Sequence, residues 1–296
     1  MLMRAAPIVF VLLWSTGFIG SKLGASDAEP FTFLALRFLI VLALLAPVML
    51  VTGRRARGGR ERGHAMVVGM LIHGLYLGGV FWAIRHGMPA GVAALIVSLQ
   101  PILTSVLSAP LLGEKLAARH WLGLALGLAG AVLILAPGLE HVLQSGSGIT
   151  VPTIVATVIA LAGITAGTIY QKRFATGTDL LAGTVWQYAG ALLLVGALSL
   201  TFETRVIDWT PKFIVALAWL VLVLSIGAIS LLMLLIRQNA VASVSGLFYL
   251  VPAVTSVIAW FMFGETLGPV QIAGLVLATL AVLMISGVRL PRRARW

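Results

Sequence analysis

The chain has 296 residues, of which 60% are hydrophobic and 10% charged, and its mean hydropathy is +1.08. A soluble domain cannot bury that much apolar surface, so the composition indicates a polytopic membrane protein. The net charge of +11 would suit a nucleic-acid partner. The charges, however, stand in short groups between long apolar runs, which is typical of topology signals. The absence of cysteine excludes disulfides, thiolate metal sites and thiol catalysis.

Ten apolar stretches follow one another along the chain. A helix needs about 20 apolar residues to cross a hydrocarbon core of about 30 Å. The first stretch, after Arg4, is followed by further apolar segments, so we interpret it as a retained membrane helix rather than a signal peptide. The expected spans are 5–24, 31–51, 65–85, 89–112, 118–136, 152–171, 180–201, 212–236, 239–262 and 268–288.

The stretch from 90 to 127 recurs 151 positions later, from 241 to 278. Both copies contain the pattern PxxTSV, which places Pro101 opposite Pro252, and both continue into Gly-Glu-x-Leu at the same interval. Matched polar residues are not explained by a general likeness of apolar helices, so the pattern indicates an internal duplication. We expect a first five-helix repeat at 1–137, a linker at 138–151, a second repeat at 152–290 and a basic tail at 291–296.

Most lysine and arginine residues gather in alternate loops, for example around Arg54, Lys115, Lys172 and Arg237. The positive-inside rule therefore predicts that both termini are cytoplasmic. Since each repeat has an odd number of spans, the second repeat must enter the membrane from the opposite side. Inverted repeats are typical of secondary transporters, whose substrate site lies near the midplane between the repeats. The fold class is thus an all-α polytopic membrane protein, with ten transmembrane helices in two inverted repeats around a central cavity.

Pro101 and Pro252 lie inside their spans and should kink them. Each kink is either merely tolerated or opens space at the centre, and the matched register favours the second interpretation. Small and mildly polar residues share the helix faces around the two prolines, which are either packing seams or cavity walls. Gly123 with Gly127, and Gly274 with Ala278, favour close packing of the fifth and tenth spans instead.

A mostly apolar, aromatic pocket with a few hydrogen-bonding groups would suit a small amphipathic solute. The candidate substrate-binding residues are Trp14, Ser15, His73, Tyr76, Ser98, Pro101, Thr165, Ser245, Tyr249 and Pro252. His73 is either hydrogen-bonded structure or a proton carrier.

Arg37 is a cation inside a span, and we favour a structural role that caps carbonyls of a neighbouring helix over recognition of a substrate carboxylate. No Asp or Glu stands in the middle of an expected span, so we expect facilitated diffusion or proton coupling through weaker groups. Nucleotide-binding and hydrolase motifs are absent, and we expect no catalytic residue, metal or cofactor. His120 and His141 are the remaining hints of a membrane enzyme, and loop charge explains them better.

The chain resembles the drug/metabolite transporter superfamily, specifically its EamA-type ten-helix members. The residues that carry the likeness are WSTGFIGSK, LALRF, and PILTSVLSAPLLGEKL with its copy PAVTSVIAWFMFGETL. The closest resemblance is to YddG-type exporters of aromatic amino acids. The resemblance implies a central cavity made by spans one to four and six to nine, with spans five and ten outside. Trp14 stands in the first helix, where four-span multidrug relatives have a glutamate, so their cation antiport is not carried over.

The sequence thus predicts an inner-membrane exporter of small amphipathic metabolites, with aromatic or hydrophobic amino acids as first candidates. Drugs, sugar derivatives and other amino acids remain alternative substrates. The lipid bilayer and a small-molecule substrate are the expected partners, and no nucleic acid is expected. We expect a monomer, because one chain already contains both repeats.

Overall fold

The computed structural model describes residues 2–24, 27–145, 149–263 and 268–286, which are almost entirely helical. The first half contains α1 (Leu2–Gly24), α2 (Pro30–Val51), α3 (Gly59–Gly69), η1 (Met70–Leu77), α4 (Gly78–Arg85), α5 (Ala90–Val97), α6 (Gln100–Leu112) and α7 (Ala118–Ser145). The second half contains α8 (Val151–Tyr170), η2 (Gln171–Ala175), α9 (Leu180–Phe202), α10 (Pro211–Trp219), η3 (Leu220–Ala228), α11 (Ile229–Gln238), α12 (Val241–Gly246), η4 (Leu247–Tyr249), α13 (Leu250–Phe263) and α14 (Pro269–Ser286).

Within these residues, 8 helical segments are long and apolar enough to cross a membrane. Two further apolar stretches, Ala5–Gly17 within α1 and Pro269–Ile285 within α14, lie at the places of the expected first and tenth spans. The chain is therefore a multi-span membrane protein.

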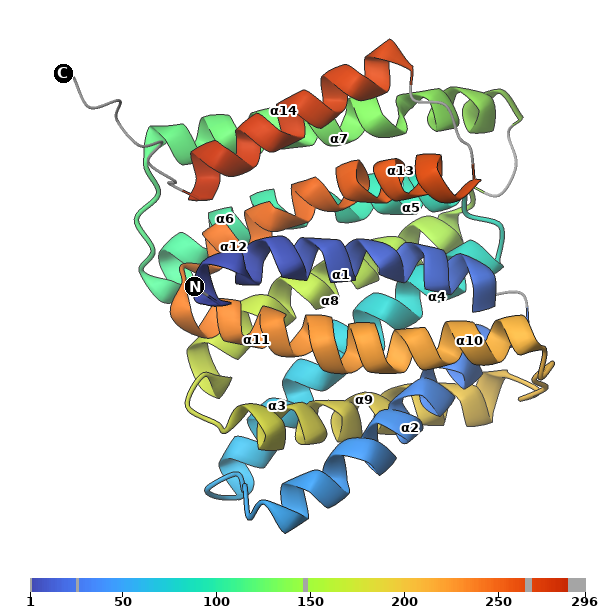
Figure 1. The fold of residues 1–296 in the computed structure, drawn as a ribbon, viewed down its shortest axis with the longest axis vertical. Coiled ribbons are helices and arrows are strands. Elements are labelled where there is room, and N and C mark those ends of the chain that lie inside the picture. The colour runs from blue at the N-terminus through green and yellow to red at the C-terminus, as the bar shows by residue number, and fades with distance from the viewer. Residues whose placement is uncertain (1, 25–26, 146–148, 264–267, 287–296) are drawn as a thin grey trace.

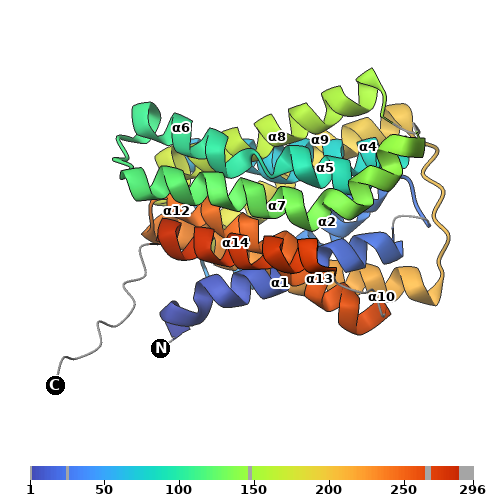
Figure 2. The same cartoon turned by 90° about the horizontal axis from the view of Figure 1, so that it is seen from above.

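The helices lie side by side, with α7 and α14 paired at one edge of the bundle and α2, α3 and α9 at the opposite edge (Figures 1 and 2). Helix α1 begins and α14 ends at the same end of the bundle (Figures 1 and 2). The turns after α2, α6, η2 and α11 lie at this end too (Figure 1). We call it the basic end, because it carries the residues Arg54, Lys115, Lys172 and Arg237.

Helices α2 and α9 are equivalent in the two sequence copies, and they pack against each other in opposite directions. Glu203, at the end of α9, accepts hydrogen bonds from the backbone N–H groups of Phe31 and Thr32 at the start of α2, at 2.8 and 2.6 Å. At the other end, Arg54 after α2 forms a 3.3 Å ion pair with Asp179 before α9. A carboxylate next to free N–H groups stabilises the start of a helix, so Glu203 links one half of the chain to the other.

Two kinds of irregular backbone occur at matching places in the two halves. The equivalent continuous helical segments α3–η1–α4 and α10–η3–α11 each contain a π-helical stretch at their middle. The helical segments α5–α6 and α12–η4–α13 contain Pro101 and Pro252. Each is interrupted just before its proline, the first at the turn Ser98–Leu99 and the second at the 3₁₀ segment η4. The kinks predicted at Pro101 and Pro252 are therefore present, because a proline cannot donate the backbone hydrogen bond that would continue the helix.

The first Gly-Glu pair ends α6 and also connects the two halves. Gly113 adopts the left-handed conformation, with φ 70°, which glycine reaches without steric cost. Glu114 then accepts hydrogen bonds from the backbone N–H groups of Val241 and Ala242, at 2.7 and 3.2 Å, at the start of α12. The second pair, Gly264–Glu265, lies outside the described residues.

The contact between α7 and α14 confirms part of the predicted glycine seam and corrects another part. A Cβ atom on Gly123 would lie 2.8 Å from Ile285, and one on Gly274 would lie 2.8 Å from the carbonyl of Gly130. Gly127 instead faces the ring of Tyr249. The seam is therefore formed by Gly123 and Gly130 of α7 with Gly274 and the predicted Ala278 of α14, whereas Gly127 packs against Tyr249 of η4.

Helix α7 also extends further than predicted. Residues 138–145 were expected in a linker, but α7 continues to Ser145. The sequence GLEHVLQS contains mostly good helix formers, and a helix tolerates Pro137 at the cost of one backbone hydrogen bond.

Candidate functional site

A buried polar cluster lies where α2, η1, α9 and η3 meet. The Nε–H of Arg37 donates a hydrogen bond to Ser225 Oγ at 2.8 Å. The hydroxyl of Tyr188 donates to the carbonyl oxygen of the same serine at 2.9 Å. Arg37 is 3% exposed, and Ser225 and Tyr188 are fully buried. Both halves of the chain thus contribute to one polar centre inside an apolar bundle.

His73, in η1, completes this centre. Its ring stacks on Tyr188, with centroids 4.7 Å apart and planes 10° apart, and Phe38 lies against both rings. Its Nε2 atom is buried, and no group in the described chain hydrogen-bonds to it. The side chain of Gln187 lies beside it. The cluster therefore combines a cation, an imidazole and an aromatic wall.

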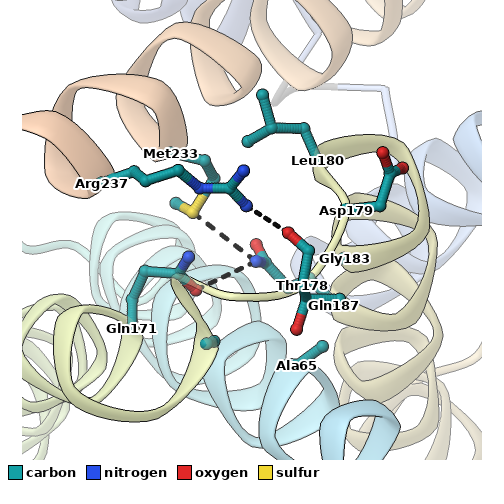
Figure 3. Close-up of a pocket in the computed structure, with 10 residues that line it drawn as sticks. Ala65, Gln171, Thr178, Asp179, Leu180, Gly183, Gln187, Met233 and Arg237 are labelled. Carbon is teal, nitrogen blue, oxygen red and sulfur yellow. Dashed lines mark hydrogen bonds between the residues drawn. The ribbon is translucent and has the colours of Figure 1, made fainter. Parts of the chain in front are cut away.

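Gln187 extends the polar groups from this centre towards the basic end. Its Nε2 donates to Gln171 Oε1 at 3.2 Å and contacts Met233 Sδ at 3.5 Å (Figure 3). Beyond Gln171, Arg237 donates a hydrogen bond to the carbonyl of Thr178 (Figure 3).

A small cavity of about 10 Å³ lies among these side chains, which is room for about one water molecule. Three buried polar atoms around it lack a partner in the described chain: Gln187 Oε1, Thr178 Oγ1 and Arg237 Nε. Buried polar groups without partners are costly, so a bound water fits this place. The cavity is far too small for a substrate.

Of the predicted residues, His73 and Tyr76 lie in η1 and Thr165 lies in α8, the helix that packs against η1. All three are buried, and Thr165 Oγ1 has no hydrogen-bond partner in the described chain.

A second group lies on α1, η4 and α13. Trp14 packs against Phe10 and Phe248, with ring centroids 5.3 Å away in each case. Ser15 is fully buried, and its Oγ donates to the carbonyl of Val11 at 2.7 Å. Pro252, on α13, is half-buried. One continuous hydrophobic cluster joins Trp14 to Tyr76 on η1, so the two groups share a core.

The remaining predicted residues surround the helix interruptions. Ser98 Oγ donates to the carbonyl of Leu95 at 2.6 Å, within its own turn, and Pro101 is buried in α6. Ser245 Oγ accepts a hydrogen bond at 3.2 Å from Gln100.

Tyr249 is fully buried, and its ring lies on Gly127 of α7, at the edge of the bundle. This contact agrees with the packing-seam interpretation of that helix face. The Tyr249 hydroxyl is buried and has no hydrogen-bond partner in the described chain.

Arg37 also departs from the expectation, because it bonds to a serine hydroxyl rather than to the carbonyls of a neighbouring helix. The sequence interpretation missed Tyr188 and Gln187 in α9. One signal was present: Tyr188 stands 151 positions after Arg37, so the two residues occupy the same place in the two copies.

Comparison with known proteins agrees with this architecture. The model of the EamA-like transporter family matches residues 5–136 and 151–287. The uncharacterized inner membrane transporter YedA of Escherichia coli (strain K12) is 26% identical over 95% of this chain and 89% of its own. A probable amino-acid metabolite efflux pump of Salmonella typhimurium is 27% identical over 97% of this chain and 96% of its own.

Two further similarities extend this pattern. A probable terminal-alkyne amino-acid exporter of Streptantibioticus cattleyicolor is 28% identical over 97% of this chain and 94% of its own. A solved structure, described as the crystal structure of a protein, superposes with a TM-score of 0.77 at 21% identity over 96% of both chains. It supports the fold alone. Because the family model covers nearly the whole chain in two matches, this protein belongs to the EamA-like transporter family.

Proposed function

We propose that this protein is a secondary transporter that exports small amphipathic metabolites, with aromatic or hydrophobic amino acids as first candidates. Transport would proceed by alternating access, as two inverted five-helix repeats rock about a shared centre. The membrane would be a bacterial inner membrane, with both termini in the cytoplasm and the functional unit a monomer. The proposed domain boundaries are those expected from the sequence, with the first helical repeat extended to Ser145.

The paired backbone irregularities are the observation that carries this proposal. One π segment and one interrupted helix stand in each half, at equivalent positions. Irregular backbone at membrane depth is tolerated only where protein or water satisfies it, and in transporters it marks the substrate path between repeats. A purely structural membrane protein whose helices face lipid would not be expected to contain four such interruptions.

The inverted arrangement is supported by the direction of the equivalent helices. Helices α2 and α9 run antiparallel, with Glu203 beside Thr32 at one end and Arg54 beside Asp179 at the other. Two copies related by a pseudo-two-fold axis in the membrane plane require this relation.

The substrate class is supported by the aromatic side chains and by the names of relatives. The group of Trp14, Phe10 and Phe248 and the wall of His73, Phe38 and Tyr188 suit an apolar body. Two relatives are named as exporters of amino acids or their metabolites. We retain Trp14, Ser15, His73, Tyr76, Ser98, Pro101, Thr165, Ser245, Tyr249 and Pro252 as candidate substrate-path residues.

Energy coupling is proposed to be absent or to use His73. The acids whose side chains are described lie at helix ends or in loops, so none of them offers a buried carboxylate for proton exchange. His73, buried beside Gln187, is the candidate for a weaker coupling group.

The test is counterflow of radiolabelled phenylalanine in proteoliposomes preloaded with unlabelled phenylalanine, with and without a proton gradient. Tryptophan, threonine and tetraphenylphosphonium serve as competitors, and protein-free liposomes are the control. We expect saturable uptake that tryptophan inhibits. Absence of saturable phenylalanine counterflow by folded protein, or counterflow that tetraphenylphosphonium but not tryptophan inhibits, would overturn the proposed function.

A further inference from the structure

We infer that Arg37 is the binding group for a carboxylate of the transported solute, so that the protein recognises anionic or zwitterionic molecules rather than organic cations. This inference rests on the proposed transport function and deepens it. The site consists of the Arg37 guanidinium, the buried His73 Nε2 and the aromatic rings beside them.

Arg37 has no counter-charge within the described part of the chain. Arg37 is 3% exposed, and no acidic side chain in the described part of the chain pairs with it. The ion pair between Arg54 and Asp179 is at the surface, where the arginine side chain is 55% exposed. A buried charge without a counter-charge destabilises the fold and persists where something else compensates it. An anion supplied from outside the chain would do so.

Most N–H donors of the Arg37 guanidinium have no hydrogen-bond partner within the described chain. A guanidinium has about five N–H groups in a planar fork. In the described chain Arg37 uses one of them, Nε–H, to Ser225. The terminal nitrogens are left for a ligand, and their geometry matches the two oxygens of a carboxylate. His73 adds a buried ring nitrogen, beside the Gln187 side chain, in the same cluster.

Neighbouring residues hold the Arg37 side chain in place. Ser225 fixes Nε, and Tyr188 fixes the backbone of Ser225 through its 2.9 Å hydrogen bond. Binding groups work best when neighbouring residues restrict their orientation. A purely structural arginine would satisfy more of its donors on the protein itself, as Lys172 does by donating to the carbonyls of Ile236, Arg237 and Asn239.

Aromatic side chains surround the charge of Arg37. The rings of Phe38, Tyr188 and His73 pack against one another beside it. The centroids of these rings lie 4.7 to 6.1 Å apart. Such a wall fits an apolar or aromatic body attached to the carboxylate. The guanidinium lies between elements of both halves, and its low exposure means that a solute reaches it after the halves move apart.

The test is thermal unfolding of the purified protein in detergent with a ligand series. The probes are phenylalanine, 3-phenylpropionate, which lacks the amine, and phenethylamine, which lacks the carboxylate. We expect a saturable rise in Tm with the first two and none with phenethylamine. In Arg37→Gln the concentration needed for a given shift rises about tenfold or more, and Arg37→Lys restores part of the loss.

Two controls separate binding from folding. Arg54→Gln removes an exposed arginine and should leave the ligand shifts unchanged. If Arg37→Gln does not fold, the ligand series on the wild type and on Arg37→Lys still decides the question. Equal stabilisation by phenethylamine and phenylpropionate, equal carboxylate shifts in wild type and Arg37→Gln, or no shift with any carboxylate would each overturn the inference.

The inference and the proposed function can fail separately. If amino acids are transported but phenethylamine is transported equally well, the transporter stands and the carboxylate site is wrong. If carboxylates stabilise the wild type in an Arg37-dependent way but none crosses the membrane, the site stands and the transport proposal is wrong.

Discussion

Arg37 and Tyr188, which occupy equivalent positions in the two copies of the sequence, converge on one residue, Ser225. The arginine bonds to its hydroxyl and the tyrosine to its carbonyl. Residues at equivalent positions of the two matched segments thus contact the same residue through different atoms. Ser225 lies in η3, where a wider helical turn leaves backbone carbonyls available to neighbours.

Replacing Tyr188 tests this contact directly. Tyr188→Phe removes one buried hydrogen bond and leaves the Ser225 carbonyl without that donor, which should cost about 0.5–1.5 kcal/mol. The Tm in detergent should fall by roughly 2–6 °C. Tyr76→Phe is the matched control, because the Tyr76 hydroxyl makes no hydrogen bond within the described chain. An equal loss of Tm in both variants would mean that the Ser225 contact contributes nothing.

Two glycines of α9 allow a test of helix packing. A Cβ atom on Gly190 would collide with the backbone carbonyl of Met66 in α3, whereas one on Gly196 would lie 3.9 Å from its nearest neighbour, Leu192. Gly190→Ala should therefore destabilise the protein by about 1–3 kcal/mol through overpacking. Gly196→Ala should be neutral or stabilise it by up to about 1 kcal/mol, because alanine favours the helix. Thermal unfolding of both variants measures the difference. A neutral Gly190→Ala would contradict the close approach of α3 and α9.

Hydropathy was sufficient to place most of the helices. The span expected at 180–201 appears as α9, and that at 31–51 appears as α2. These boundaries follow from local apolar length, which a single sequence contains. The interruptions before Pro101 and Pro252 were likewise predictable, because the loss of a backbone donor is a local property.

The polar centre was not predictable in the same way. Periodicity tells which residues share a helix face, but not which other helix meets that face. Tyr249 therefore turned out to face α7, and Arg37 turned out to face Ser225, 188 residues away. The π segments were missed as well, because their extra backbone turn depends on packing between neighbouring helices rather than on composition.

Acid should weaken the contact between the start of α2 and the loop after α9. Partial burial raises the pKa of Glu29, but hydrogen bonds from the side chain and backbone of Thr204 and from the backbone of Arg205 outweigh it, so that its pKa is lowered overall. A lowered folded-state pKa gives stability that is present above the unfolded value and is lost as the pH falls through the folded value.

We therefore expect the Tm of the wild type to fall as the pH decreases from about 5 to about 3. Glu29→Gln should have a lower Tm at pH 7 and a flatter profile across this range. Asp208→Asn in the same loop region is the control, because no described group hydrogen-bonds to that side chain. Parallel profiles for wild type and Glu29→Gln would show that Glu29 does not contribute this dependence.

The central claim is that the two halves are inverted copies, and the equivalent helices α2 and α9 offer the most direct test. Arg55 follows α2 and Val206 follows α9; both are exposed, and the chain has no native cysteine. Single variants Arg55→Cys and Val206→Cys are treated with a membrane-impermeant maleimide in intact and in permeabilised cells. The inverted arrangement predicts that Val206→Cys is labelled in intact cells and Arg55→Cys only after permeabilisation. Labelling of both positions from the same side would contradict it.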